Sequence, residues 1–148
     1  MCLISRCLIK ETAKQDMIVY KVLRSIDDTT ARATVFEGFE YVKGRTNPRV
    51  NISPQRLVTR EGLIIDEAYH AYRHIPDLKK YSSYNDVYRI IIPKGTIYYK
   101  SDIEDEIASE TNIMNERISY NHKFKGLTFS ERCYVLKSKI ISLFSKLQ

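Results

Sequence analysis

The sequence predicts an α+β fold in which a twisted mixed or antiparallel sheet carries a C-terminal amphipathic helix packed on one face. Three observations favour this class. Short β-rich runs fill residues 1–116, the spacing of apolar residues changes from a strand-like to a helix-like period after Thr128, and 148 residues suit one domain. We therefore expect a single domain over residues 1–148, with a β-rich body at 1–116 and a helix at 128–147.

Several runs in the first half of the chain have the composition of strands. Residues 3–9 are typical of an edge strand, and MIVYKVLR at 17–24 is typical of a core strand. The pieces ARATVF and FEYVKG look extended and are joined by a bend at Gly38. Residues 45–56 are expected to form a loop because their two prolines block regular pairing.

The second half holds the strongest strand signal. EGLIIDEAYHAYRH can be one helix or two strands, and its alternation favours strands at GLIID and AYHAY. A short helix is expected at Pro76, where proline suits a first turn. VYRIIIP and TIYYK, joined by Pro-Lys-Gly, predict a central hairpin over Val87–Tyr99. The acids that follow can open a helix at Ser101, but alternation over 107–113 favours a loop and then a strand.

The C-terminal segment has the period of an amphipathic helix. Apolar residues recur every three or four positions, and Thr128-x-x-Glu131 matches a capping box. We expect the apolar face to cover the sheet. The alternative is that this face binds a partner helix or a membrane surface, although a coiled coil would need more heptads than fit here.

Composition limits the compartment and the kind of site. Cys2, Cys7 and Cys133 are an odd number, which favours reduced thiols over a complete set of disulfides. No apolar run approaches the roughly 20 residues that span a bilayer. We therefore expect a cytoplasmic protein, in the host cytoplasm if it is phage-encoded, with no membrane contact, no metal and no cofactor.

One cluster has the residue types of a ligand site. In an extended segment, His70, Tyr72 and His74 share one face, and an imidazole pair beside a phenol can bind a planar or anionic ligand. We include Tyr69 from the same segment, and Lys94 at the rim of the hairpin. The alternative is two surface histidines beside a half-buried tyrosine.

The net charge of +6 is unevenly distributed, with seven bases and one acid in residues 117–148. A basic surface with many tyrosines can bind nucleic acid through phosphate contacts and stacking. Because the bases are scattered singly, a solvated surface is the alternative. The residues that would carry nucleic-acid binding are Lys123, Lys125, Arg132, Lys137 and Lys139.

Two resemblances add expectations. The order YKVLR, GFEYVKGR, AYHAY and IIIPKGTIYY resembles small uncharacterised proteins of tailed phages and mobile elements, over about residues 1–115. This resemblance implies a phage-type accessory protein. IIIPKGTIYYKSDIEDE is similar to the late part of ADP-ribosyltransferase folds, which implies that Arg24 contacts cofactor phosphates and that Glu104 and Glu106 form the catalytic turn.

The standard catalytic signatures are absent from the sequence. Its five glycines do not form a phosphate-binding loop, and there is no Gly-x-Ser-x-Gly or His-Glu-x-x-His motif. We therefore expect a binding protein, rather than an enzyme, that occupies a host macromolecule or a nucleotide-like ligand, one version being an inhibitor of host defence. The alternatives are an ADP-ribosyltransferase-like enzyme, a nucleic-acid-binding module and a virion component that oligomerises through the terminal helix.

Overall fold

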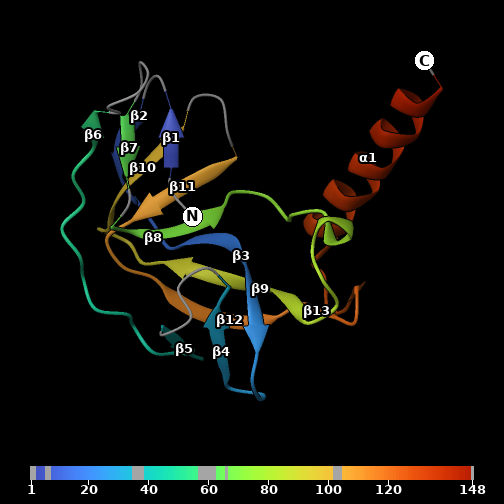
Figure 1. Ribbon diagram of the computed structural model, residues 1–148, viewed down its shortest axis with the longest axis horizontal. Coiled ribbons are helices and arrows are strands. Elements are labelled where there is room, and N and C mark those ends of the chain that lie inside the picture. Colours follow the sequence, from blue (N-terminus) through green and yellow to red (C-terminus); the bar gives the residue numbers. More distant parts are fainter. Residues whose placement is uncertain are drawn as a thin grey trace.

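The structure is a computed structural model of the chain, and it describes residues 3–5, 8–34, 39–56, 63–65, 67–101 and 105–147. A large antiparallel sheet is followed by one C-terminal helix, so the predicted α+β class is confirmed (Figure 1). Within these residues, no helix combines the length and the apolar character needed to cross a membrane.

The large sheet has nine strands, and each strand pair in it is antiparallel. Its strands are β2 (Leu8–Thr12), β3 (Met17–Ser25), β4 (Thr30–Ala33), β5 (Glu40–Val42), β8 (Tyr69–Tyr72), β9 (Asn85–Ile92), β10 (Ile97–Ser101), β11 (Glu106–Ser109) and β12 (Ile113–Arg117). Seven of them run in the order β12-β9-β3-β8-β11-β10-β2. The other two branch from β3, because β4 pairs with β3 and β5 pairs with β4.

Two smaller sheets accompany it. A three-stranded sheet has the order β1-β7-β6, and β13 pairs with β14 in a hairpin. The bounds are β1 (Leu3–Ser5), β6 (Gln55–Arg56), β7 (Leu63–Ile65), β13 (Ser119–Tyr120) and β14 (Lys123–Phe124). The β13-β14 turn places Asn121 and His122 at φ values of 47° and 62°, the left-handed region that suits a tight hairpin.

The expected central hairpin over Val87–Tyr99 is wrong. β9 pairs with β3 and β12, whereas β10 pairs with β11 and β2. The two strands are therefore not neighbours, and β3, β8 and β11 lie between them in the strand order. The Pro-Lys-Gly turn is held by the connection between β2 and β3. The Gly95 N–H donates to the Ala13 carbonyl at 2.8 Å, and the Lys94 N–H donates to the Asp16 carboxylate at 2.9 Å.

The sheet buries apolar side chains on both faces, as alternate residues of β3 show. Val19 and Leu23 belong to one cluster, and Tyr20 and Val22 belong to another. β3 is therefore a central strand, as the sequence predicted.

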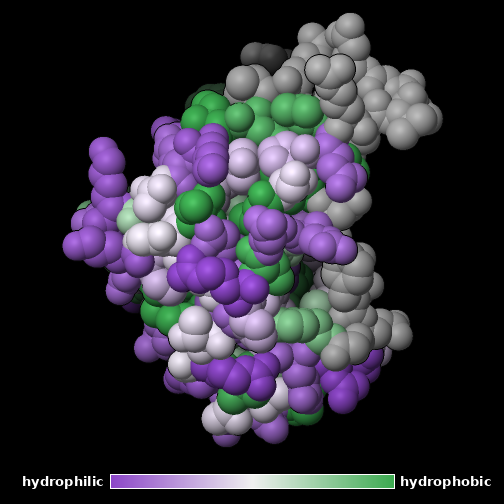
Figure 2. Space-filling view, turned by 90° about the vertical axis from the view of Figure 1, so that its left-hand side faces the viewer, coloured by the Kyte–Doolittle hydropathy of each residue, from purple (hydrophilic) through white to green (hydrophobic). Residues whose placement is uncertain are grey.

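Figure 2 shows the side of the molecule that lies to the left in Figure 1, where hydrophilic residues are interspersed with separate small hydrophobic areas.

The other predicted strands are confirmed in part. GLIID contains β7, AYHAY contains β8, and residues 8–12 form an edge strand. The strand expected over 107–113 is two strands, because the chain turns between β11 and β12. The helix expected at Pro76 is only the 3-10 turn η1 (Leu78–Lys80), and the bend at Gly38 lies outside the described residues.

The helix α1 (Phe129–Lys146) begins at the predicted capping box. The Glu131 N–H donates to the Thr128 hydroxyl at 3.2 Å, and the Thr128 N–H donates to the Glu131 carboxylate at 2.8 Å. The expected packing of its apolar face on the sheet is wrong. Only the start of α1 contacts the body, and the rest projects away from it (Figure 1). α1 meets the body through the buried, charged Glu131 and the partly buried Val135, which packs against the cluster that contains Tyr20 and Val22, and neither residue belongs to its apolar stripe.

Candidate functional site

A fork in the sheet creates a cleft. On the side away from β9, β3 pairs with β8 at Tyr20 and with β4 from Leu23 to Ser25. Lys21 and Val22 lie between these two pairings, where β8 and β4 separate. Because a separated pair of strands leaves room that side chains fill only in part, the fork is where a ligand can reach the middle of the sheet.

The cleft at the fork has a volume of about 300 Å³, near the lower end of the range for small-molecule sites. Aromatic side chains form most of its wall. They come from β8 and from the segment around β5, with one more from the loop after η1, and Lys21 of β3 adds a cation. The aromatic residues are Phe39, Tyr41, Tyr69, Tyr72 and Tyr81.

The aromatic rings are fixed by contacts with each other and with the backbone. The Phe39 ring meets Tyr41 and Tyr69 edge to face, with centroids 5.0 and 5.8 Å apart. The Tyr69 hydroxyl donates to the Pro48 carbonyl at 2.6 Å, and the Tyr81 hydroxyl donates to that of Tyr72 at 3.0 Å. Burial raises the pKa of Tyr41 and, with the hydrogen bond from Tyr81, that of Tyr72, so both phenols are neutral at physiological pH.

Lys21 supplies the charge in this cleft. Its Nζ donates to the His70 carbonyl oxygen at 2.6 Å. Burial lowers the pKa of the Lys21 ammonium to about 8, and the nearby Glu106 carboxylate opposes this effect. The ammonium is therefore charged at neutral pH and becomes neutral within the mildly alkaline range.

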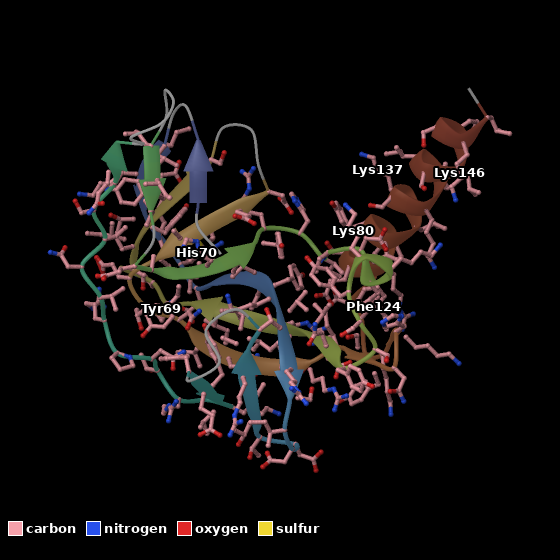
Figure 3. The ribbon with its side chains drawn as sticks, viewed as in Figure 1. Tyr69, His70, Lys80, Phe124, Lys137 and Lys146 are labelled. Carbon is pink, nitrogen blue, oxygen red and sulfur yellow. The ribbon has the colours of Figure 1, made fainter. Side chains whose placement is uncertain are left out.

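The structure brings together three of the five predicted ligand-binding residues. Tyr69, His70 and Tyr72 line the cleft, and Figure 3 shows Tyr69 and His70 at the start of β8. His74 does not line it, because its Nδ1 is hydrogen-bonded to Asp105 at 2.7 Å and its ring stacks on Tyr134 of α1. Lys94 also lies outside the lining, in the exposed turn between β9 and β10.

Of the described residues implied by the transferase resemblance, Glu106 lies near the cleft and Arg24 is outside its lining. Arg24 is exposed on β3, opposite Asn85 of β9. Glu106 begins β11 and pairs with Tyr72 of β8, which pairs with Tyr20 of β3. Arg24 is four residues beyond Tyr20 on β3, so it is separated from Glu106 by two strand spacings across the sheet and by four residues along it. Glu104 lies outside the described residues.

A second, polar cleft of about 370 Å³ lies beside β12 and the β13-β14 hairpin. Two of its cations are engaged by carboxylates, since Arg89 contacts Glu116 and Arg117 contacts Asp86, both at 2.6 Å. Lys125, from the predicted nucleic-acid set, also lines this cleft. The other members of that set are exposed on β14 or α1: Lys123, Arg132, Lys137 and Lys139.

Sequence reasoning did not select Lys21, although a signal for it was present. MIVYKVLR has one cation between Tyr20 and Val22 in the middle of a core strand, where a lysine is rarely placed unless its ammonium has a partner. Phe39, Tyr41 and Tyr81 gave no such signal, because only the pairing of β4, β5 and β8 brings them to the fork.

Comparisons with family models, with curated proteins and with solved structures returned no match. Among the residues that the structure describes, no group of three or more His, Cys, Asp and Glu side chains is placed to hold a metal ion.

Proposed function

We propose that this chain is a small accessory binding protein of the phage type, and that it acts by binding a nucleotide-like ligand in the cleft at the fork. The observation that carries the proposal is the meeting of an aromatic wall with the Lys21 ammonium in one cleft. The phage-type role itself comes from the sequence resemblance and stays a prediction.

The chemistry of the cleft suits a planar ligand with an anionic group. Phenol and phenyl rings offer stacking surfaces, which accept any base because each base has a π-face. The Lys21 ammonium, beside an apolar wall that weakens competition from water, suits a phosphate or carboxylate oxygen. A cleft of about 300 Å³ is near the size of a nucleoside monophosphate and small for a dinucleotide.

The state of the cleft residues supports binding more than catalysis. A general base works best with a pKa near the operating pH, whereas the pKa values of Tyr41 and Tyr72 are raised well above it. These phenols therefore serve as rings and hydrogen-bond donors. The pKa of Lys21, lowered by burial to about 8, leaves its ammonium charged at pH 7, and its role in this proposal is to hold that charge.

The proposal is tested by titrating the protein with AMP, GMP, CMP and UMP, and with the four corresponding nucleosides as ligands without phosphate, using isothermal calorimetry at pH 7. We expect at least one nucleotide to bind, and the matching nucleoside to bind at least about tenfold more weakly, because it lacks the group that contacts Lys21. The absorbance spectrum of the purified protein, which contains 11 tyrosines and no tryptophan, also reveals a retained nucleotide near 260 nm.

Two variants make this test specific. Lys21→Met removes the charge but keeps the length and apolar character of the side chain, and it should weaken nucleotide binding at least about tenfold. Lys94→Met is the matched control, because Lys94 is exposed and lies outside the cleft. If no nucleotide binds, or if both variants lose affinity equally, the proposed ligand class is wrong.

A further inference from the structure

The apolar side of α1 faces away from the body of the protein. Glu131 is buried against the sheet, where Arg89 and Tyr20 hold its carboxylate at 2.6 and 2.7 Å. Leu136 follows five residues later, which places it about 140° around the helix axis from Glu131. Leu136, Ile140 and Leu143 are exposed to 60%, 45% and 63%. The contact with the body therefore leaves the apolar side of the helix open.

Six of the exposed apolar residues of α1 follow a regular spacing, and Tyr134, Ile141 and Phe144 are exposed outside this set. We call this set the seam; its members are Phe129, Cys133, Leu136, Ile140, Leu143 and Leu147. Successive members are alternately four and three residues apart, the spacing of the a and d positions through which two helices pack. A helical partner packs against this alternation, and the exposed Phe144 and Ile141 widen the apolar arc on the side of Lys137.

The charges beside the seam repeat with the same register. Arg132, Lys139 and Lys146 are seven residues apart, and each directly precedes a seam residue. Lys137 borders the other side of the seam. These are the flanking positions whose charges select the partner of a helix. Figure 3 shows Lys137 and Lys146 on the projecting part of α1, away from the sheet.

We propose that the seam of α1 docks onto a helix of another protein whose flanking positions are acidic. The seam spacing identifies the partner element as a helix, and the basic borders identify its charge. A second copy of this chain fits less well, because an antiparallel pair would set Arg132 against Lys146 and Lys139 against its own counterpart, and a parallel pair would set Arg132 against Lys137. The proposal is independent of the cleft and of the ligand proposed there.

The start of α1 prepares it for this contact. The capping box and the ion pair between Glu131 and Arg89 fix the first turns, so the helix is presented before a partner arrives. The seam is short for a coiled coil that must form from two unfolded chains. The partner is therefore a helix that is already folded within its own protein.

The test uses two designed helical hairpins as probes. Each displays leucine and isoleucine at seam-matching positions, with glutamate at the flanks of one hairpin and lysine at the flanks of the other. We expect the full-length protein to bind the acidic probe at least about tenfold more tightly than the basic one, measured by calorimetry at low salt. The triple variant R132E/K139E/K146E should reverse this preference.

Single variants locate the contact on the seam. Ile140→Asp should lower affinity for the acidic probe at least about tenfold, whereas Ser138→Asp introduces the same group on the opposite side of α1 and should change affinity less than about twofold. Circular dichroism checks that both variants stay folded. Equal affinity for the two probes overturns the proposal.

Two further outcomes assign the seam to another occupant and so also overturn it. In the first, the protein binds vesicles of phosphatidylglycerol and phosphatidylcholine, and Ile140→Asp abolishes this binding while neither probe binds. In the second, the protein self-associates in sedimentation, and Ile140→Asp disperses it. Failure of nucleotide binding leaves the proposal unaffected, because the seam and the cleft share no residue.

Discussion

Lys21 lies in the middle of β3, between two buried side chains, and its ammonium donates to the His70 carbonyl. In water a lysine would keep its proton to a much higher pH, but burial lowers the pKa of Lys21 to about 8. The unfolded chain therefore binds a proton more tightly than the folded chain at this position. Holding the charged form in the cleft costs folding free energy, and an anionic ligand would offset that cost.

This cost can be measured as a pH dependence of stability. Between about pH 8 and the ordinary lysine pKa of 10.5, the unfolded chain holds the Lys21 proton and the folded chain does not. The Lys21 contribution to the free energy of unfolding should therefore rise with pH across this window. Chemical denaturation at pH 7 to 10.5 should show a rise in the wild type that is smaller in Lys21→Met; equal slopes would contradict the assignment.

The charge of Glu131 stabilises the folded chain, whereas that of Lys21 destabilises it. Burial alone would raise the pKa of its carboxyl, but hydrogen bonds from Arg89, the Thr128 backbone and Tyr20 lower it to about 2. The unfolded chain binds the proton more tightly below its ordinary pKa of 4.5. The contribution of this group is therefore complete above about pH 4.5 and is lost as the pH falls toward 2.

Glu131→Gln tests this anchor. It leaves the buried guanidinium of Arg89 without its main counter-charge, and breaking a buried pair in this way typically costs about 3 kcal/mol or more. We expect a loss of that size at pH 7, with a smaller loss of stability on acidification than in the wild type. The same substitution at Glu116, whose side chain is largely exposed, should cost less than about 1 kcal/mol.

At the scale of single residues, the sequence predicted three of the cleft residues and missed the others. Tyr69, His70 and Tyr72 could be predicted as a group because they are neighbours in AYHAY, and only local strand geometry is needed to bring them together. His74 follows in the same run, but Asp105 and Tyr134 hold it elsewhere. Those partners are distant in sequence, and no local pattern reveals them.

At the scale of elements, local patterns predicted the type of an element better than its neighbours. The period of the C-terminal segment and its capping box correctly predicted α1, and alternation predicted β3 and β8. The Pro-Lys-Gly turn suggested that β9 and β10 pair, yet both edges of β9 are taken by β3 and β12. Which strand occupies an edge is decided by competition among all strands, and a turn motif does not encode it.

The turn between β9 and β10 provides a test at this scale. Gly95 has a φ of 86°, and a Cβ there would meet no heavy atom within 4 Å, so backbone strain is the cost of a larger residue. Gly95→Ala should lower the free energy of unfolding by about 1–2 kcal/mol, measured in urea. Gly95→Asn should cost less, because asparagine tolerates the left-handed region better; equal costs would point to a cause other than strain.

At the scale of the whole molecule, β3 joins the parts of the sheet. It pairs with β9 along its length and divides its other edge between β8 and β4, which creates the cleft. Its alternate side chains also belong to the two apolar clusters. The fork is a property of the complete topology, and this is why the sequence alone indicated a sheet without indicating its cleft.

The central position of β3 predicts a large difference between its buried and exposed residues. Leu23 is fully buried and Ile18 is 46% exposed. Leu23→Ala should cost about 2–5 kcal/mol, because it leaves a cavity in the core, whereas Ile18→Ala should cost about 1 kcal/mol or less. Urea denaturation of the two variants compares them directly, and similar costs would contradict the placement of β3.

The measurement that tests the account most directly is calorimetric titration of the nucleoside monophosphates into the wild type and Lys21→Met, at pH 7 and again at pH 9.5. The account predicts that a nucleotide binds the wild type at pH 7, that its affinity falls at pH 9.5 as Lys21 loses its proton, and that Lys21→Met binds weakly at both values. Affinity that is independent of both pH and Lys21 would contradict it.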